Sequence, residues 1–150
     1  MEIYTLGHST RTMEEFLDIL RRHQIKCIVD VRRFPKSSRH PWFNKENLEK
    51  VLKEKKIKYL WLGKELGGYR GPKDIEEVGH KPGKCIKGQA FYNYCLYTES
   101  KSFKKGLKRL IKLSQKDLSA IMCAEKLYFK CHRMIIALRL KEKGIEVKHL

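Results

Sequence analysis

Residues 122–133, MCAEKLYFKCHR, contain two cysteines, a glutamate, a histidine and an arginine. Side chains of these types can hold a metal ion, attack a substrate as nucleophiles or bind an anion. A structural zinc site is disfavoured, because seven residues separate Cys123 from Cys131 and no two cysteines of the chain have zinc-ligand spacing. The chemistry of this segment is therefore better sought in nucleophilic catalysis or anion binding.

A cysteine followed by five residues and an arginine is the spacing of the phosphate-binding loop in cysteine-dependent phosphatases. Cys27 and Arg33 have this spacing, but the intervening IVDVR is more typical of an apolar strand than of a loop. Neither Cys123 nor Cys131 is followed by an arginine at that distance. A phosphatase or sulfurtransferase loop of this kind is disfavoured.

Cys131 precedes His132 and Arg133 at the predicted start of a helix. A thiol near a helix N-terminus or a cation has a lowered pKa, so Cys131 and His132 are candidate catalytic residues, although a structural role suits Cys131 equally well. Cys123 directly follows an apolar strand and is more typical of a small core residue. Because adjacent helical residues do not face each other, we do not expect Cys131 and His132 to form a ready-made dyad.

Asp30 lies between Val29 and Val31 in an apolar segment, where a carboxylate is costly unless it is paired or used. Two interpretations stay open. Asp30 either accepts hydrogen bonds from loop amides or an arginine and so orients the loop at residues 32–41, or it acts as a general base or orients a histidine.

Four arginines lie in or beside loops near these residues, and guanidinium suits bidentate recognition of phosphate or carboxylate. Any one of them could be an ordinary surface residue, whereas several that converge would form an oxyanion site. Together with a serine after the first strand, the candidate substrate-binding residues are Ser9, Arg32, Arg39, Arg70 and Arg133.

Strands and helices alternate along the chain. Thr12 and Glu15 have the spacing of a capping box, Asn44 is a plausible helix N-cap, and Gly144 suits the position after a helix C-terminus. The predicted strands are residues 2–6, 26–31, 57–62, 118–122 and 145–149, and the predicted helices are residues 13–20, 44–55, 90–115 in two pieces, and 132–143.

This alternation predicts an α/β fold, with an open, mostly parallel sheet of about five strands and helices on both faces, in a single domain over residues 1–150. Residues 32–43 contain two prolines and are expected to be irregular, and residues 64–88, rich in glycine and charge, form a long loop of the kind that is usually functional or mobile.

In open parallel sheets, ligands bind outside the carboxyl ends of the strands. The polar residues at the predicted strand ends and in the segment after the fourth strand give the candidate catalytic set His8, Asp30, Glu125, Cys131 and His132. Asp30 and Glu125 would suit a hard divalent cation, but no sequence signature supports one, and no cofactor is predicted.

The chain is strongly basic, with 34 Lys and Arg against 17 Asp and Glu and a formal charge of +17. Such a charge attracts polyanions, so nucleic acid or a phosphorylated small molecule is the expected partner. A Lys-rich surface can also reflect solubility or thermal adaptation, but adaptation would raise both signs together.

One predicted helix carries a basic stripe that would suit phosphates, although a solvated helix face explains it as well. The candidate nucleic-acid-binding residues on this stripe are Lys101, Lys105, Lys108 and Lys112. No apolar run is long enough to cross a membrane and no signal peptide is recognised, so a cytoplasmic protein with reduced thiols is expected; the oligomeric state is not predicted.

Several motifs, in order along nearly the whole chain, resemble the domain of unknown function 488 family: GHST, DVRRFPKSSRHPWFN, ELGG, MCAE, CHR and the terminal strand with His149. The family has no settled activity. Its motif positions map to His8, Ser9, Asp30, Arg32, Pro35, Ser37, Phe43, Leu66, Gly67, Gly68, Cys123, Glu125, Cys131, His132 and Arg133. Residues 128–130 depart from the pattern, where a tryptophan and an arginine are common.

The leading hypothesis is an enzyme, a hydrolase or transferase, that acts on nucleic acid or a phosphorylated nucleotide-like substrate at the carboxyl ends of the strands. The alternative is a non-catalytic nucleic-acid-binding protein that uses the basic helix face. A third interpretation is association with an acidic protein. The geometry that separates these interpretations is whether Asp30, Glu125, His132 and Arg133 meet His8 in one open pocket.

Overall fold

A computed structural model describes residues 1–78 and 89–150. The strands are β1 (Glu2–Gly7), β2 (Cys27–Asp30), β3 (Lys58–Trp61), β4 (Ser119–Cys123) and β5 (Glu146–His149). The α-helices in the described ranges are α1 (Met13–Arg22), α2 (Lys45–Glu54), α3 (Gly63–Leu66), α4 (Gln89–Tyr97), α5 (Lys101–Lys116) and α6 (Arg133–Glu142). Short 3-10 turns are η1 (Pro41–Phe43), η2 (Pro72–Ile75) and η3 (Tyr128–Lys130).

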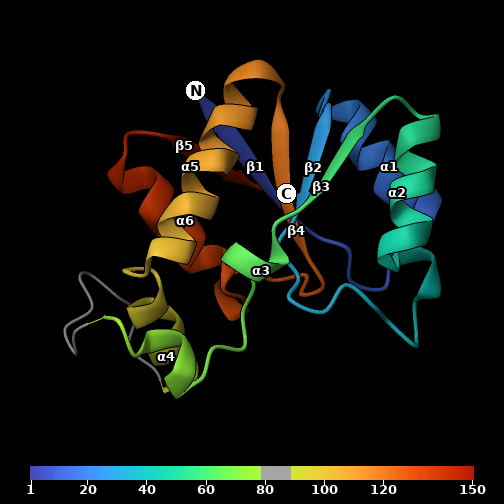
Figure 1. Cartoon of the computed structure of the whole chain (residues 1–150). Helices are drawn as coiled ribbons and strands as arrows, with labels where there is room; N and C mark the ends of the chain where they lie inside the picture. The colour runs from blue at the N-terminus through green and yellow to red at the C-terminus, as the bar shows by residue number, and fades with distance from the viewer. Residues whose placement is uncertain (79–88) are drawn as a thin grey trace.

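The five strands form one open parallel sheet in the order β3-β2-β4-β1-β5. Helices α1 and α2 cover one face, and α5 and α6 cover the other (Figure 1). The predicted α/β class and the parallel sheet with helices on both faces are therefore confirmed. Because all strands run in the same direction, their carboxyl ends share one edge of the sheet, which we call the exit edge.

Alternating side chains of the strands supply two apolar cores. Val29, Ile121 and Cys123 point to the α5 and α6 side, whereas Ile28 and Met122 point to the α1 and α2 side. Because side chains alternate along a strand, Asp30 points to the same side as Ile28, the α1 and α2 side. Residues two positions apart at a strand end thus reach the same face, and neighbours in sequence reach opposite faces.

Local sequence signals account for the helix boundaries. Thr12 and Glu15 form the predicted capping box of α1, with reciprocal bonds of 3.1 and 2.8 Å. Gly144 follows α6 with φ of 80°, as expected for a residue just beyond a helix end. Asn44 precedes α2 as predicted, but its Oδ1 accepts from the Ser37 amide at 2.6 Å and does not cap the helix.

Two predicted irregular segments contain short helical turns. Residues 32–43 include η1, and residues 64–88 include η2 and overlap α3, so the prediction of loops without any regular element was wrong there. Pro41 and Pro72 begin η1 and η2, since a first helical position needs no amide donor and proline already has a helical φ. The rest of the predicted long loop, residues 79–88, lies outside the described residues.

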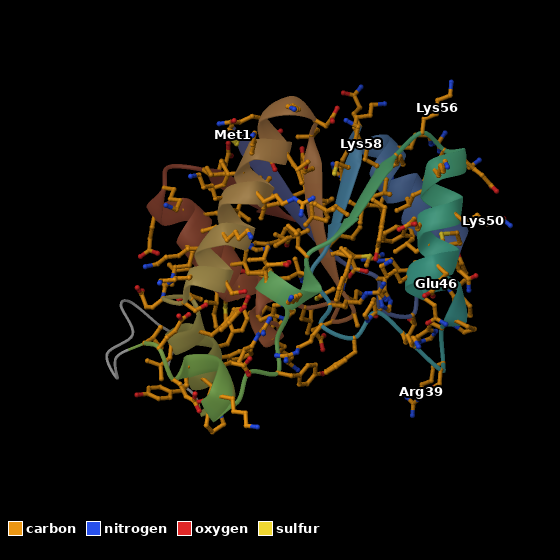
Figure 2. All side chains as sticks on the ribbon, in the orientation of Figure 1. Met1, Arg39, Glu46, Lys50, Lys56 and Lys58 are labelled. Atoms are coloured by element: carbon orange, nitrogen blue, oxygen red, sulfur yellow. The ribbon has the colours of Figure 1, made fainter. Side chains whose placement is uncertain are left out.

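The two ends of the sheet are easy to tell apart. Met1 and Lys58, which precede or begin strands, lie at one end of the molecule in Figure 2, and Arg39, in the segment after β2, points outward at the other end. That second end is the exit edge.

Candidate functional site

A buried ion pair lies at the exit of β2. Arg32 Nη2 donates to Asp30 Oδ2 at 2.7 Å, and Arg32 Nε and the Arg32 amide donate to Oδ1 at 2.9 and 3.1 Å. The Tyr59 hydroxyl donates to Oδ2 as well. Burial, together with the Asp30 charge, raises the pKa of Tyr59, so this hydroxyl keeps its proton. Asp30 is fully buried, and both of its oxygens have partners.

His8 continues this network. Its Nδ1 donates to the Ser9 carbonyl at 3.0 Å, so its Nε2 carries the lone pair and faces Arg32 Nη1 at 3.4 Å. The ring stacks on Phe43, with centroids 4.5 Å apart. Burial, assisted by the Arg32 charge, lowers the pKa of His8 to about 4, so the imidazole is neutral at pH 7. His8 thus holds the guanidinium by accepting a hydrogen bond.

A second polar cluster lies on the opposite face of the sheet. Cys123 Sγ lies 2.9 Å from Cys131 Sγ, and Cys131 Sγ lies 3.4 Å from His132 Nδ1. His132 Nε2 donates to the Val31 carbonyl at 3.0 Å, which aims Nδ1 at the sulfur. The Tyr94 ring meets the His132 ring edge-on, and Gly68 lies against it.

The two thiols of this cluster differ in acidity. The Cys123 thiol donates to Cys131 and so lowers the pKa of Cys131, and His132 lowers it further. Burial raises the pKa of Cys123, which keeps its proton. Cys131 is therefore the sulfur that ionises, and it has the larger exposed fraction, 6% against 2%.

The contact between Cys131 and His132 corrects a prediction made from helical geometry. Cys131 lies before α6 in extended backbone, with φ of −131° and ψ of 153°, and only His132 turns into the helix. The rule that adjacent helical residues diverge does not apply at this junction. The change of backbone conformation between the two residues lets their side chains meet.

Arg133 is a fully buried cation that ties three segments together. Its Nη2 donates to the carbonyls of Glu125 and Lys126 at 2.6 and 3.2 Å, and its Nη1 donates to Thr5 Oγ1 at 3.2 Å. Its Nε has no partner among the described residues. The guanidinium therefore holds the turn after β4 against β1.

The other predicted site residues lie apart from these clusters. The Glu125 side chain is exposed and accepts from the Leu127 amide at 3.1 Å. Arg70 donates to the carbonyls of Lys64 and Gly67 at the end of α3, and Arg39 is exposed in the loop after β2. Ser9 follows His8 with φ of 48°.

The predicted site residues therefore separate into two clusters around β2, and Asp30, Glu125, His132 and Arg133 do not meet His8 in one open pocket. Asp30, Arg32 and His8 lie on the α1 and α2 side, and Cys131 and His132 lie on the α5 and α6 side. The two clusters are linked at Val31, the residue between Asp30 and Arg32. Its carbonyl accepts the hydrogen bond from His132.

Three contributors were not predicted from the sequence. Tyr59 reaches Asp30 from β3, where it pairs in register with Ile28, and Thr5 reaches Arg133 from β1. Tyr94 packs on His132 from α4. For Tyr59 and Thr5, the available sequence signal was the alternation of side chains along β3 and β1. This alternation sets the face of the sheet that each residue occupies.

Within residues 1–78 and 89–150, no group of three or more His, Cys, Asp or Glu side chains is placed to hold a metal ion. Cys27, Cys123 and Cys131 are free thiols, but Cys95 is disulfide-bonded, so the expectation of reduced thiols does not hold there. None of the helices in the described ranges has the length and apolar composition needed to cross a bilayer.

These features define an α/β protein with a five-stranded parallel sheet and polar clusters at its exit edge. The family described as Domain of unknown function DUF488 matches residues 12–140, most of the chain, and the protein belongs to this family. Comparisons with curated proteins and with solved structures gave no match.

Proposed function

We propose that this protein is an enzyme that acts on nucleic acid or on a phosphorylated nucleotide-like substrate, with Cys131 as its nucleophile. The observation that carries the proposal is the position of Cys131 Sγ between the Cys123 thiol and the His132 imidazole. Both neighbours stabilise a thiolate, and the N-terminus of α6 directly follows. A thiolate beside a histidine is the arrangement of covalent cysteine catalysis.

His132 is suited to act as the acid partner in this scheme. Its Nε2 bond to the Val31 carbonyl fixes the ring and turns the Nδ1 lone pair toward the Cys131 thiol. Nδ1 takes the thiol proton as the thiolate forms, and can then donate that proton where the thiolate attacks. As the Cys131 sulfur bonds to an electrophilic carbon, the displaced electron pair moves to the neighbouring heteroatom. That atom takes the Nδ1 proton of His132.

The other buried polar residues of the exit edge serve to position this pair in the proposal. The Asp30 and Arg32 ion pair, with His8, holds the segment that supplies the Val31 carbonyl. Arg133 holds the turn that begins beside Cys123. The net charge of +17 supports an anionic substrate, because it draws phosphates toward the protein before any specific contact forms.

Iodoacetamide alkylation of Cys131, followed by peptide mass spectrometry across pH, tests the proposal. Because the pKa of Cys131 is lowered, its alkylation rate should be nearly flat between about pH 6 and about pH 9, whereas an ordinary thiol gains about tenfold per pH unit below its pKa. The variant His132→Gln should slow alkylation at pH 6. Free cysteine alkylated in the same buffers is the control for an ordinary thiol.

A Cys131 rate that climbs with pH as steeply as that of a free thiol would reject the thiolate and with it the catalytic assignment. An unchanged rate at pH 6 in His132→Gln would also reject the assignment. Cys131→Ser should abolish labelling of this peptide, which confirms that the label is on Cys131.

A second function, nucleic-acid binding without catalysis, is supported by α5. The lysines of its basic stripe are exposed, and a groove of about 450 Å³ is lined by Lys105, Lys108, Arg109 and Lys112. The opposite side of the helix, with Phe103, Leu107 and Leu110, is buried.

Under this second function, replacing Lys108 and Lys112 by Ala should weaken oligonucleotide binding. The slope of log affinity against log salt should fall by about one for each phosphate that the variant no longer neutralises. Glu125→Gln should bind like the wild type. Fluorescence titrations over a range of salt concentrations measure both. An unchanged slope in the double lysine variant would remove α5 from the interface.

A further inference from the structure

Exposed apolar side chains concentrate at the exit edge. Eight large apolar residues of the described ranges are exposed, and six of them follow the carboxyl ends of β2, β3 or β4. Five of these six are aromatic: Phe34, Trp42, Tyr69, Tyr128 and Phe129. Exposed rings gathered on one edge, beside the proposed catalytic pair, indicate a binding surface.

Phe34 and Tyr69 form the most open part of this surface. Phe34 is 66% exposed and Tyr69 is 86% exposed, yet their ring centroids lie 6.0 Å apart. They come from the segments after β2 and α3, which Arg33 joins by donating from Nη1 to the Tyr69 carbonyl at 3.3 Å. Tyr69 also holds a left-handed backbone conformation, with φ of 59°. The two rings are therefore presented to solvent by a defined contact between two segments.

The backbone segments that carry these rings contact the Cys131 and His132 cluster. Phe34 lies three residues after Val31, whose carbonyl binds His132. Tyr69 directly follows Gly68, where an added Cβ would lie 3.2 Å from His132 Nδ1. A planar group held by the rings would be near the proposed nucleophile.

The charge around the rings selects the kind of planar group. Residues 33–44 contain Arg33, Lys36 and Arg39 and no acidic residue, and the Arg33 guanidinium lies 5.9 Å from the Phe34 ring centroid. Arg33 also pairs with Asp74 at 3.6 Å, so Lys36 and Arg39 are the exposed cations of this segment. Aromatic rings interleaved with cations bind unpaired nucleobases by stacking while the cations contact the phosphates. A duplex, in which the bases are already stacked on one another, offers no free face to the rings.

We infer that Phe34 and Tyr69 form a stacking platform for unpaired bases, and that the substrate class of the proposed enzyme is single-stranded nucleic acid. The inference rests on the proposed function for the role of the nearby thiolate, but the binding itself needs no thiolate. Lys36 and Arg39, which are exposed in the same segment as Phe34, supply the phosphate contacts, and Arg33 holds the two segments of the platform together.

The test is fluorescence anisotropy with a labelled single-stranded RNA of about 12 nucleotides, the matching single-stranded DNA and the corresponding duplex, all at about 0.1 M salt. The single strands should bind more tightly than the duplex. Phe34→Leu and Tyr69→Leu should each weaken binding about tenfold, because leucine is apolar but has no π-face. Phe34→Tyr and Tyr69→Phe are the matched controls, since they keep the ring, and they should bind like the wild type.

Both side chains are exposed, so the leucine variants should keep the wild-type unfolding midpoint and their affinities report on binding alone. Leucine variants that bind as tightly as the wild type, equal affinity for duplex and single strand, or no oligonucleotide binding would each overturn the inference. An apolar docking site for a protein would instead tolerate leucine. Failure of the Cys131 alkylation test would remove the proposed catalysis and leave these binding results standing.

Discussion

Replacing Asp30 by Asn should lower the free energy of unfolding by about 3 to 5 kcal/mol, the usual cost of removing one partner from a buried ion pair. The asparagine side chain would have the size of the native carboxylate but no charge, so Arg32 would be left as a buried cation without its counter-ion. The Tyr59 hydroxyl would also lose its carboxylate acceptor. Urea unfolding followed by circular dichroism measures the change.

A double-mutant cycle with Arg32→Met separates the pair from its surroundings. Removing both charges should cost less than the sum of the two single changes, because the double variant contains no uncompensated buried ion. If the two single changes in unfolding free energy simply add, Asp30 and Arg32 stabilise the fold independently. That outcome would contradict their bidentate contact.

The expected loss of stability in Asp30→Asn also affects the activity of this variant. An Asp30→Asn variant would lose activity by loosening the segment that holds Val31 and His132, even though Asp30 touches no substrate in the proposed scheme. Retained stability together with lost turnover would instead support a general-base role for Asp30. Stability and turnover therefore have to be measured on the same preparations.

The second large effect is expected from Gly7→Ala at the end of β1. A Cβ at this position would lie 1.8 Å from the Glu125 carbonyl oxygen and 2.9 Å from Lys126 Cα. Both are backbone atoms, so no side-chain rotation relieves the clash, and the turn after β4 must move. We expect a loss of about 3 kcal/mol or more, at the upper end of overpacking effects, measured by thermal or urea unfolding.

The same substitution should disturb the site as well as the fold. The displaced carbonyls of Glu125 and Lys126 are those that Arg133 binds, and Cys123 ends the strand just before them. Cys131 alkylation should therefore lose its flat pH dependence in Gly7→Ala. Gly71→Ala is the matched control, because an added Cβ there meets nothing within 4 Å, and it should leave both measurements near wild type. A stable Gly7→Ala protein would contradict the close approach of β1 to this turn.

The elements of the fold could be predicted because their signals are local. Apolar strands, the Thr12 and Glu15 capping box and Gly144 after α6 each act within a few residues, and the alternation of strands and helices then implies a parallel sheet. The short turns η1 and η2 escaped prediction, since a proline at a first helical position looks in sequence like a loop residue.

The sequence also placed the polar residues at one edge, because parallel strands share the edge at which they end. It could not choose the partner of Asp30 among several arginines, nor show that Tyr59 and Thr5 complete the buried contacts. Those choices depend on strand register and on which face each residue occupies, and a shift of one position reverses the face.

By itself, then, the sequence determined the order of the elements, the edge that carries the polar residues and the strong positive charge. Only the tertiary structure decided that Cys131 meets Cys123 and His132, and that Phe34 meets Tyr69. The physical reason is that these contacts depend on the backbone dihedral angles of the exit loops and on residues distant in sequence, such as Phe34 and Tyr69. Neither leaves a periodic pattern in the chain.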